Sequence, residues 1–190
     1  MSKHQNTFPN EIRIIAGRWR GRKLKVAENA SLRPTPSRVR ETLFNWLMFD
    51  VQEATCLDLF AGTGALGFEA LSRGAKKAVF IEPDKASVAL LKHNADILPE
   101  CAAEIVVDTA ENYLARTKEQ FDVIFLDPPF LDQKLIPTLD LLLKSNAVHD
   151  NTLIYVESDA FPEWPNPLSL YKQSKAAHVH FGLLKKQTAK

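Results

Sequence analysis

Residues 57–67 read Leu57-Asp58-Leu59-Phe60-Ala61-Gly62-Thr63-Gly64-Ala65-Leu66-Gly67. They join a short apolar run, residues 54–59, to the start of a helix at Ala65, and such a run is typical of a buried strand. Because Gly62 and Gly64 lack a Cβ atom, the backbone between them can turn sharply and approach a ligand closely. The free N–H groups at the start of the helix would face that ligand. The stretch therefore predicts a loop that binds a nucleotide cofactor.

Two cofactors compete for this loop, and a glycine turn without any ligand is a third interpretation. Gly62, Gly64 and Gly67 match the dinucleotide pattern G-x-G-x-x-G, with Glu82 at the distance where an acid binds the ribose. S-adenosylmethionine (SAM) carries an ammonium group and no phosphate, so it favours an acid at the end of the strand, where Asp58 lies. A carboxylate attracts an ammonium group and repels a pyrophosphate.

A second motif, Asp127-Pro128-Pro129-Phe130, follows the apolar run at residues 121–126. Consecutive prolines donate no backbone hydrogen bond and cannot continue the strand, so they predict a rigid turn at its carboxyl end. In an open α/β sheet, ligands bind at that edge. The Asp127 side chain and the Pro128 carbonyl are two acceptors, and Phe130 is a ring for stacking. This set suits the exocyclic amino group of a planar base, and it favours SAM as the cofactor.

The two motifs resemble those of class I SAM-dependent methyltransferases that act on amino groups, which carry [N/D]-P-P-[F/Y/W]. Residues 33–47, RPTPSRVRETLFNWL, and residues 59–75, LFAGTGALGFEALSRGA, resemble the RsmD family. The resemblance covers residues 13–157. It implies methylation of N2 of guanine 966 in bacterial 16S ribosomal RNA (rRNA). It also implies the α/β, Rossmann-like class I methyltransferase fold, with a mostly parallel seven-stranded sheet that ends in an antiparallel hairpin.

The family resemblance, together with the positions at the ends of predicted strands, predicts which residues form the site. Glu82 would bind the ribose hydroxyls, Asp108 and Ala110 would lie beside the adenine, and the Arg33–Thr35 loop would lie beside the methionine end or the substrate base. The expected cofactor-binding residues are Asp58, Phe60, Ala61, Gly62, Gly64, Glu82, Asp108, Ala110 and Thr35. The expected catalytic residues are Asp127, Pro128, Pro129 and Phe130.

The charge of the chain is unevenly distributed. Residues 1–40 hold ten Lys or Arg and two Glu, a net charge of +8, whereas the remainder has a net charge of −7. Residues 12–16 and 23–26 predict two strands, and the turn between them is crowded with cations. Phosphate attraction and base stacking at such a turn would suit RNA, although a solvated charged hairpin is the alternative. The expected RNA-binding residues are Arg18, Trp19, Arg20, Arg22, Lys23 and Arg33.

From the charge distribution and the resemblance we expect two parts. Residues 1–34 are an N-terminal tail with a basic β-hairpin that contacts RNA, and residues 35–190 are a SAM-dependent methyltransferase domain. Thr35 suits the N-cap of a helix and Pro36 its first position. From residue 54, predicted strands and helices alternate, which indicates a parallel sheet with helices on both faces. Two final strands, residues 168–171 and 178–184, have no helix between them and must pair antiparallel. The predicted strands of this alternation are 55–59, 78–81, 104–107, 122–126 and 152–156. The first predicted helix starts at residue 65, and the other three span 85–97, 111–117 and 135–145.

The cysteines, the histidines and the distribution of apolar residues limit the possible functions and locations of the protein. Cys56 and Cys101 form no zinc pattern and are expected to be free thiols in a reducing compartment. His178 and His180 have no third partner, so we expect no metal. No signal-like or membrane-length apolar run is present. We expect a cytoplasmic monomer whose partner is 16S rRNA in the small ribosomal subunit or its assembly intermediates. Methylation of adenine N6 or cytosine N4 in DNA stays open, as does a non-catalytic RNA- or nucleotide-binding module, which Asp127-Pro128-Pro129-Phe130 disfavours.

Overall fold

The computed structural model describes residues 11–26, 35–128 and 134–187. Its larger sheet has seven strands in the order β5-β4-β3-β6-β7-β9-β8. The five strands from β5 to β7 run parallel, whereas β9 pairs antiparallel with both β7 and β8. The strands are β3 (Thr55–Asp58), β4 (Lys77–Ile81), β5 (Ala103–Val106), β6 (Phe121–Leu126), β7 (Val148–Ser158), β8 (Leu168–Ala176) and β9 (Val179–Lys186).

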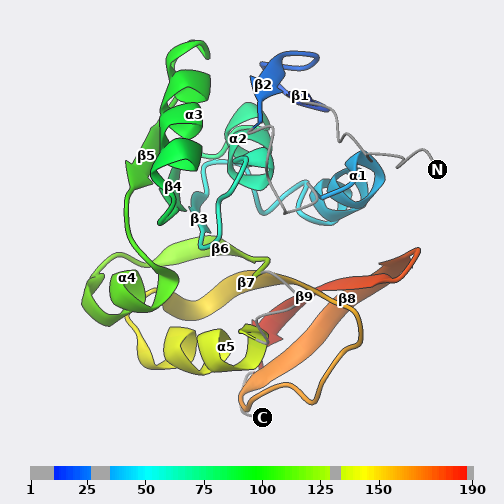
Figure 1. Cartoon of the computed structure of the whole chain (residues 1–190). Helices are drawn as coiled ribbons and strands as arrows, with labels where there is room; N and C mark the ends of the chain where they lie inside the picture. The colour runs from blue at the N-terminus through cyan, green and yellow to red at the C-terminus, as the bar shows by residue number, and fades with distance from the viewer. Residues whose placement is uncertain (1–10, 27–34, 129–133, 188–190) are drawn as a thin grey trace, which may run out of the picture.

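Helices cover both faces of this sheet (Figure 1). Alternate residues of each strand point to opposite faces, so Cys56 and Leu57 enter two different cores. The first core packs against α1 (Ser37–Trp46), α2 (Ala65–Ser72) and α3 (Lys85–Asp96). The second packs against α4 (Ala110–Arg116) and α5 (Leu135–Lys144). The predicted alternation, the parallel sheet and the terminal antiparallel hairpin are confirmed.

The first two strands, β1 (Glu11–Arg13) and β2 (Lys23–Lys25), form a separate antiparallel hairpin beside α2 (Figure 1). A two-stranded hairpin is marginal alone, and this one is held by buried side chains of the main domain. Ile14 and Leu24 join the first core. The buried side chain of Asn94 on α3 accepts a hydrogen bond from the Lys25 N–H and donates one to the Lys25 carbonyl.

A second attachment is a buried charged cluster, the Glu69 clamp, formed by Glu69 on α2, Arg40 on α1 and Arg73. The Glu69 carboxylate accepts hydrogen bonds from the backbone N–H groups of Ile15 and Ala16 at 2.8 and 3.0 Å. It also forms ion pairs with Arg73 at 2.7 Å and Arg40 at 3.5 Å. Arg40 in turn donates two hydrogen bonds to the carbonyl of Arg13. The clamp therefore fixes the hairpin to two helices of the domain.

The structure corrects two details of the prediction. Helix α1 begins at Ser37 with Pro36 as N-cap and no side-chain cap, because the hydroxyl of Thr35 turns instead towards Asp127. Strand β8 extends to Ala176, beyond the predicted end at residue 171. Its second half is polar because β8 is an edge strand whose side chains are mostly not buried, so the apolar pattern ends before the strand does. The hairpin before β9 turns at Ala177 with φ of 54°, a conformation usually left to glycine. Within the described residues, no helix has both the length and the apolar character needed to cross a membrane.

Candidate active site

Five carboxylates lie at or just beyond the carboxyl ends of five neighbouring parallel strands. In the order of the sheet they are Asp108 after β5, Glu82 after β4, Asp58 of β3, Asp127 after β6 and Glu157 of β7. The chain connects β3 to β4 on one side and returns to β6 on the other, so the strand order reverses between Asp58 and Asp127. Ligands of open α/β sheets bind in the crevice outside such a switch point. The acidic edge suits a cationic ligand and repels a pyrophosphate.

The glycine-rich loop lies beside this switch point. Gly62 and Gly64 have φ of 49° and 75°, which side chains with a Cβ atom rarely adopt. Among the residues that the structure describes, a Cβ added to Gly62 would meet only the Phe60 carbonyl, at 3.9 Å, so these residues leave space beside the loop tip. A Cβ at Gly67 would lie 2.3 Å from the Phe80 ring, so Gly67 permits the close packing of α2 on β4. Phe60 and Ala61 precede the two glycines; Phe60 is half-buried and Ala61 is buried.

Backbone donors already orient Glu82. Its two oxygens accept hydrogen bonds from the N–H groups of Gly62 at 2.8 Å and Asp84 at 2.9 Å. Each carboxylate oxygen has a second lone pair, so Glu82 can still accept hydrogen bonds from two hydroxyls. Glu82 thus couples the tip of the glycine loop to the end of β4.

Asp108 forms an ion pair with Arg116 and does not cap α4. Its Oδ2 accepts hydrogen bonds from Arg116 at 2.6 and 3.2 Å, and this contact holds the pKa of the Asp108 carboxyl below its ordinary value. Thr109 caps α4 instead, and its hydroxyl accepts a hydrogen bond from the Asn112 N–H. Ala110 is buried as the first residue of that helix.

The two carboxyls at the switch point have different environments. Asp58 is buried, and burial raises its pKa to about 7, although its Oδ2 accepts a hydrogen bond from the Gly67 N–H. Burial and then the neighbouring Glu157 and Asp58 raise the pKa of Asp127, and the hydroxyl of Thr35 donates to its Oδ2 at 3.4 Å. Thr35, expected to lie near the cofactor, therefore contacts the Asp-Pro-Pro-Phe motif directly. Pro128 is buried, whereas Pro129, Phe130 and Arg33 lie outside the described residues.

Glu157 was not predicted from the sequence, although it is 4% exposed and contacts the site. The pairing of Leu126 with Val156 places the next residues, Asp127 and Glu157, side by side. The signal was available, because Glu157 directly follows an apolar run, as Asp127 does.

The basic hairpin presents its cations to solvent but hides its aromatic ring. Arg20 and Arg22 are exposed, and neither side chain forms a hydrogen bond or ion pair within the described ranges, whereas Arg18 contacts Glu100 and Lys23 contacts Glu11. The expectation that Trp19 stacks on RNA is wrong for this structure. Trp19 is 4% exposed, its Nε1 donates to the Pro99 carbonyl, and the Arg18 guanidinium covers its ring at 4.4 Å. The ring serves to pack the hairpin on the domain.

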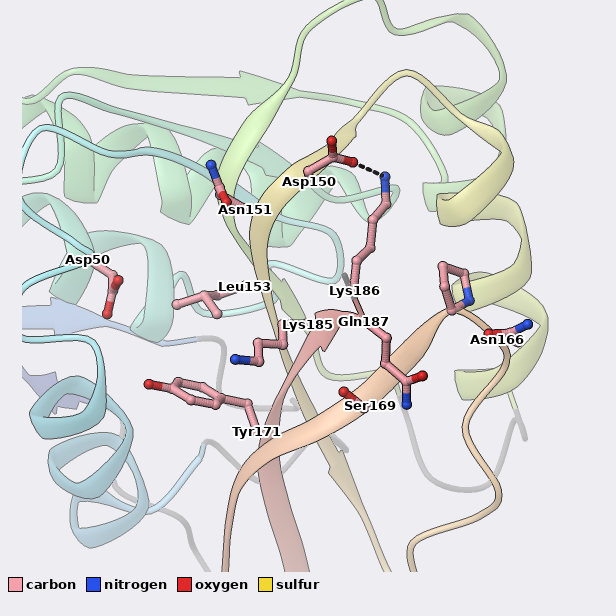
Figure 2. A pocket seen from close by; sticks show the side chains of 11 residues that line it. Asp50, Asp150, Asn151, Leu153, Asn166, Ser169, Tyr171, Lys185, Lys186 and Gln187 are labelled. Atoms are coloured by element: carbon pink, nitrogen blue, oxygen red, sulfur yellow. Dashed lines mark hydrogen bonds and ion pairs between the residues drawn. The ribbon is translucent and has the colours of Figure 1, made fainter. Parts of the chain in front are cut away.

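A pocket of about 950 Å³ lies elsewhere, at the opposite end of β7 (Figure 2). Asp150 and Asn151 come from the amino-terminal half of β7, whereas Glu157 lies near its carboxyl end. Lys186 pairs with Asp150 at 3.3 Å, and the Nζ atom of Lys185 lies 4.2 Å from the Tyr171 ring centroid. The pocket includes none of the predicted site residues, so we place the candidate site at the acidic edge and not here.

The fold and its strand-end site define a class I methyltransferase, and the solved structures agree. The Escherichia coli protein yhhF has a TM-score of 0.85 and 44% identity, covering 94% of this chain and 99% of that chain. The family described as "Conserved hypothetical protein 95" matches residues 12–185. This chain belongs to that family, the RsmD family.

Two curated relatives share the name "Ribosomal RNA small subunit methyltransferase D". The Escherichia coli (strain K12) protein is 43% identical over 190 residues, which cover 98% of this chain and 96% of the relative. The Haemophilus influenzae protein is 49% identical over 154 residues, covering 78% of this chain and 79% of the relative. The residues that match the family model, 12–185, therefore include the glycine loop, the acidic edge and Asp127.

Proposed function

We propose that this protein transfers a methyl group from SAM to the exocyclic N2 amino group of a guanine in 16S rRNA, at a position equivalent to guanine 966. The observation that carries the proposal is that the carboxyls of Asp58 and Asp127 lie at the ends of neighbouring strands, on the two sides of the switch point and beside the glycine loop. One carboxyl suits a cationic cofactor and the other suits an amino group that donates hydrogen bonds. The names of the relatives support rRNA as the substrate.

The residues at the acidic edge fit SAM. Asp58 would attract the ammonium group, Glu82 would accept from the ribose hydroxyls, and the backbone of residues 60–64 would border the cofactor at the open tip of Gly62. Asp108 and Ala110 would flank the adenine, and Thr35 the methionine end. Bound SAM supplies an electrophilic methyl group on a sulfonium. The protein supplies position and electrostatics.

Asp127 and the Pro128 carbonyl would accept the two amino hydrogens of the base and turn the nitrogen lone pair towards the methyl group. Guanine N2 is a weak nucleophile because its lone pair is delocalised into the ring, so this orientation matters. Phe130 would stack on the base, and Pro129 would keep the turn rigid. The base must be unpaired or turned out of its helix to reach this edge.

The hairpin would hold the RNA through its phosphates. Arg20 and Arg22 are exposed cations of the turn and have no acidic partner in the described ranges, so they are the first phosphate ligands, with Arg18, Lys23 and Arg33 as the other cations of the proposed RNA-binding set. In this proposal residues 1–34 are the RNA-binding extension of a methyltransferase domain at residues 35–190. The enzyme acts as a monomer in the cytoplasm, on the small ribosomal subunit or its assembly intermediates.

The titration of Asp58 predicts that SAM binding depends on pH. Because the pKa of Asp58 is raised to about 7, ionising it costs free energy in the free protein and is favoured by the cofactor's positive charge. Affinity for SAM should increase as pH rises towards about 7, below the titration of the cofactor's own amine. Asp58→Asn should raise the Kd about 10²-fold and remove this pH dependence. Isothermal titration calorimetry over this pH range measures both effects, and an unchanged Kd in D58N would refute the assignment.

The same variant should make the cofactor-free protein more stable. A carboxyl whose pKa rises on folding from 3.8 to about 7 binds its proton more tightly in the folded state, so stability declines as pH rises through that window. The asparagine side chain of D58N has no charge to bury and can still accept from the Gly67 N–H. At pH 8 we expect D58N to be more stable than the wild type by about 2–4 kcal/mol in urea unfolding. Equal stabilities at pH 8 would contradict the shifted pKa.

Methyl transfer from labelled SAM tests the function directly. Undermethylated small subunits, their free 16S rRNA and DNA are compared as substrates, and the products are digested to nucleosides. We expect N2-methylguanosine from the subunits or their RNA. Methylated adenine or cytosine in DNA would keep the chemistry and reject the RNA target. SAM binding without transfer to any substrate would reject the proposed substrate, and binding of NAD in place of SAM would reject the cofactor.

A further inference from the structure

Glu157 is a buried carboxyl that has no role in the proposed function. It is 4% exposed, and the hydroxyl of Tyr155, which is fully buried, donates to its Oε1 at 2.6 Å. Within the described ranges its other oxygen, Oε2, accepts no hydrogen bond. In those ranges the wholly buried side-chain atom that lacks a partner is Nε of Arg40, so Oε2 keeps some contact with solvent. One oxygen of Glu157 is therefore anchored, and the other is available to a ligand.

The pairing of β6 with β7 places this carboxyl beside Asp127 and on the same face of the sheet. Phe125 pairs with Tyr155, and both side chains lie in the first core. Two residues further along, Asp127 and Glu157 point to that same face. Asp127 also has one anchored oxygen, because the Thr35 hydroxyl donates to its Oδ2 at 3.4 Å. Within the described ranges, Oδ1 of Asp127 and Oε2 of Glu157 are thus two neighbouring acceptors that remain unpaired.

Two neighbouring acceptors match guanine and no other base with an exocyclic amino group. The N2 amino group of guanine is flanked by N1–H, so two adjacent ring positions present hydrogen-bond donors. The N6 amino group of adenine is flanked by the lone pair of N1, and the N4 amino group of cytosine by the lone pair of N3. A carboxylate that faces such a lone pair is left without a donor, which disfavours binding of adenine or cytosine.

The protonation states of the two carboxyls agree with this use. Burial raises the pKa of both, and Glu157 and Asp58 raise that of Asp127 further, whereas the Tyr155 hydroxyl lowers that of Glu157. Of the two, Glu157 therefore ionises more readily and is the better acceptor for a ring N–H. Asp127 keeps an acceptor oxygen for the amino group in either protonation state.

We propose that Oε2 of Glu157 accepts a hydrogen bond from N1–H of the target guanine, and that this contact makes the site select guanine over adenine and cytosine. Asp127 and the Pro128 carbonyl would still hold the amino group itself. The inference rests on the proposed function and assigns its base specificity to a residue. The Asp-Pro-Pro-Phe motif suits any exocyclic amino group, whereas Glu157 distinguishes the ring nitrogen beside it.

The test changes that ring nitrogen and keeps the amino group. 2-Aminopurine carries the same amino group as guanine, but its N1 bears a lone pair where guanine has a hydrogen. The two bases are compared at the target position of ligated, unmethylated 16S rRNA in reconstituted small subunits, by single-turnover transfer from labelled SAM. We expect the wild type to favour guanine about 10–100-fold. In Glu157→Gln the amide oxygen accepts from Tyr155 and the amide nitrogen donates to the base, so the preference should fall below about threefold or reverse.

Glu157→Ala removes the contact without adding a donor. Its rate with guanine should fall about 10–100-fold, towards the rate with 2-aminopurine, while calorimetry shows a SAM Kd changed less than about threefold. Glu163→Ala, at an exposed position, is the matched control and should keep the wild-type preference. A wild-type preference for guanine in E157Q or E157A would overturn the inference and leave N2 methylation intact. A wild-type enzyme that forms no N2-methylguanosine would overturn the proposed function, and the inference with it.

Discussion

Asp127→Ala is expected to lower kcat about 10²–10³-fold and to change the Kd for SAM less than about threefold. The side chain would accept one of the two amino hydrogens and stabilise the positive charge that develops on nitrogen, so its loss acts on the transition state. Removing one such preorganised polar contact costs about 3–4 kcal/mol of activation free energy. Asp58 and Glu82, which we assign to the cofactor, remain in place, so SAM binding should be retained.

Single-turnover methylation and calorimetric titration of SAM check these two expectations together. Asp140→Ala on the exposed side of α5 is a matched control that removes the same groups far from the acidic edge. Asp127→Asn keeps an acceptor oxygen but loses the charge, and we expect its kcat to lie between those of D127A and the wild type. A D127A enzyme with near wild-type kcat would remove Asp127 from the mechanism.

Glu69→Ala is expected to destabilise the protein by about 3–5 kcal/mol, because it leaves buried charges and donors without their partner. Arg40 is 2% exposed and Glu69 is fully buried, so water cannot replace the lost carboxylate. The N–H groups of Ile15 and Ala16 would lose their acceptor as well. The destabilisation should release the hairpin, and with it the proposed grip on RNA.

Urea unfolding measures the stability, and limited proteolysis between Ile15 and Arg22 reports release of the hairpin. Glu104→Ala is the control, because its ion pair with Lys77 at 2.7 Å is solvent-exposed and such pairs contribute about 0–1 kcal/mol. If E69A lost no more stability than E104A, the Glu69 clamp would not be what holds the hairpin. If it lost stability but kept RNA affinity, the hairpin would not be the RNA-binding element.

Local sequence patterns determined most of the fold. Mostly apolar runs of four to six residues, each followed by a helical stretch, predicted β3 to β6 and their helices to within a few residues. The central strands β3, β4 and β6 are recognisable because burial on both faces imposes apolar residues on the strand itself. Asp58, Glu82 and Asp127 were predicted for the same reason, since each residue ends or follows such a strand and parallel strands expose their ligands at one edge. The polar half of β8 was missed because an edge strand carries no such requirement.

What only the tertiary structure decided were contacts between residues far apart in the chain. No local pattern shows that Trp19 is buried under Arg18, that Glu69 binds the backbone of the hairpin, or that the Thr35 hydroxyl contacts Asp127. The exposure of an aromatic ring and the raised pKa of a buried acid such as Asp58 both depend on which segments pack together. The sequence by itself determined which strand ends carry acids. Packing decided which of those acids lie side by side, as Asp127 and Glu157 do beyond the paired residues Leu126 and Val156.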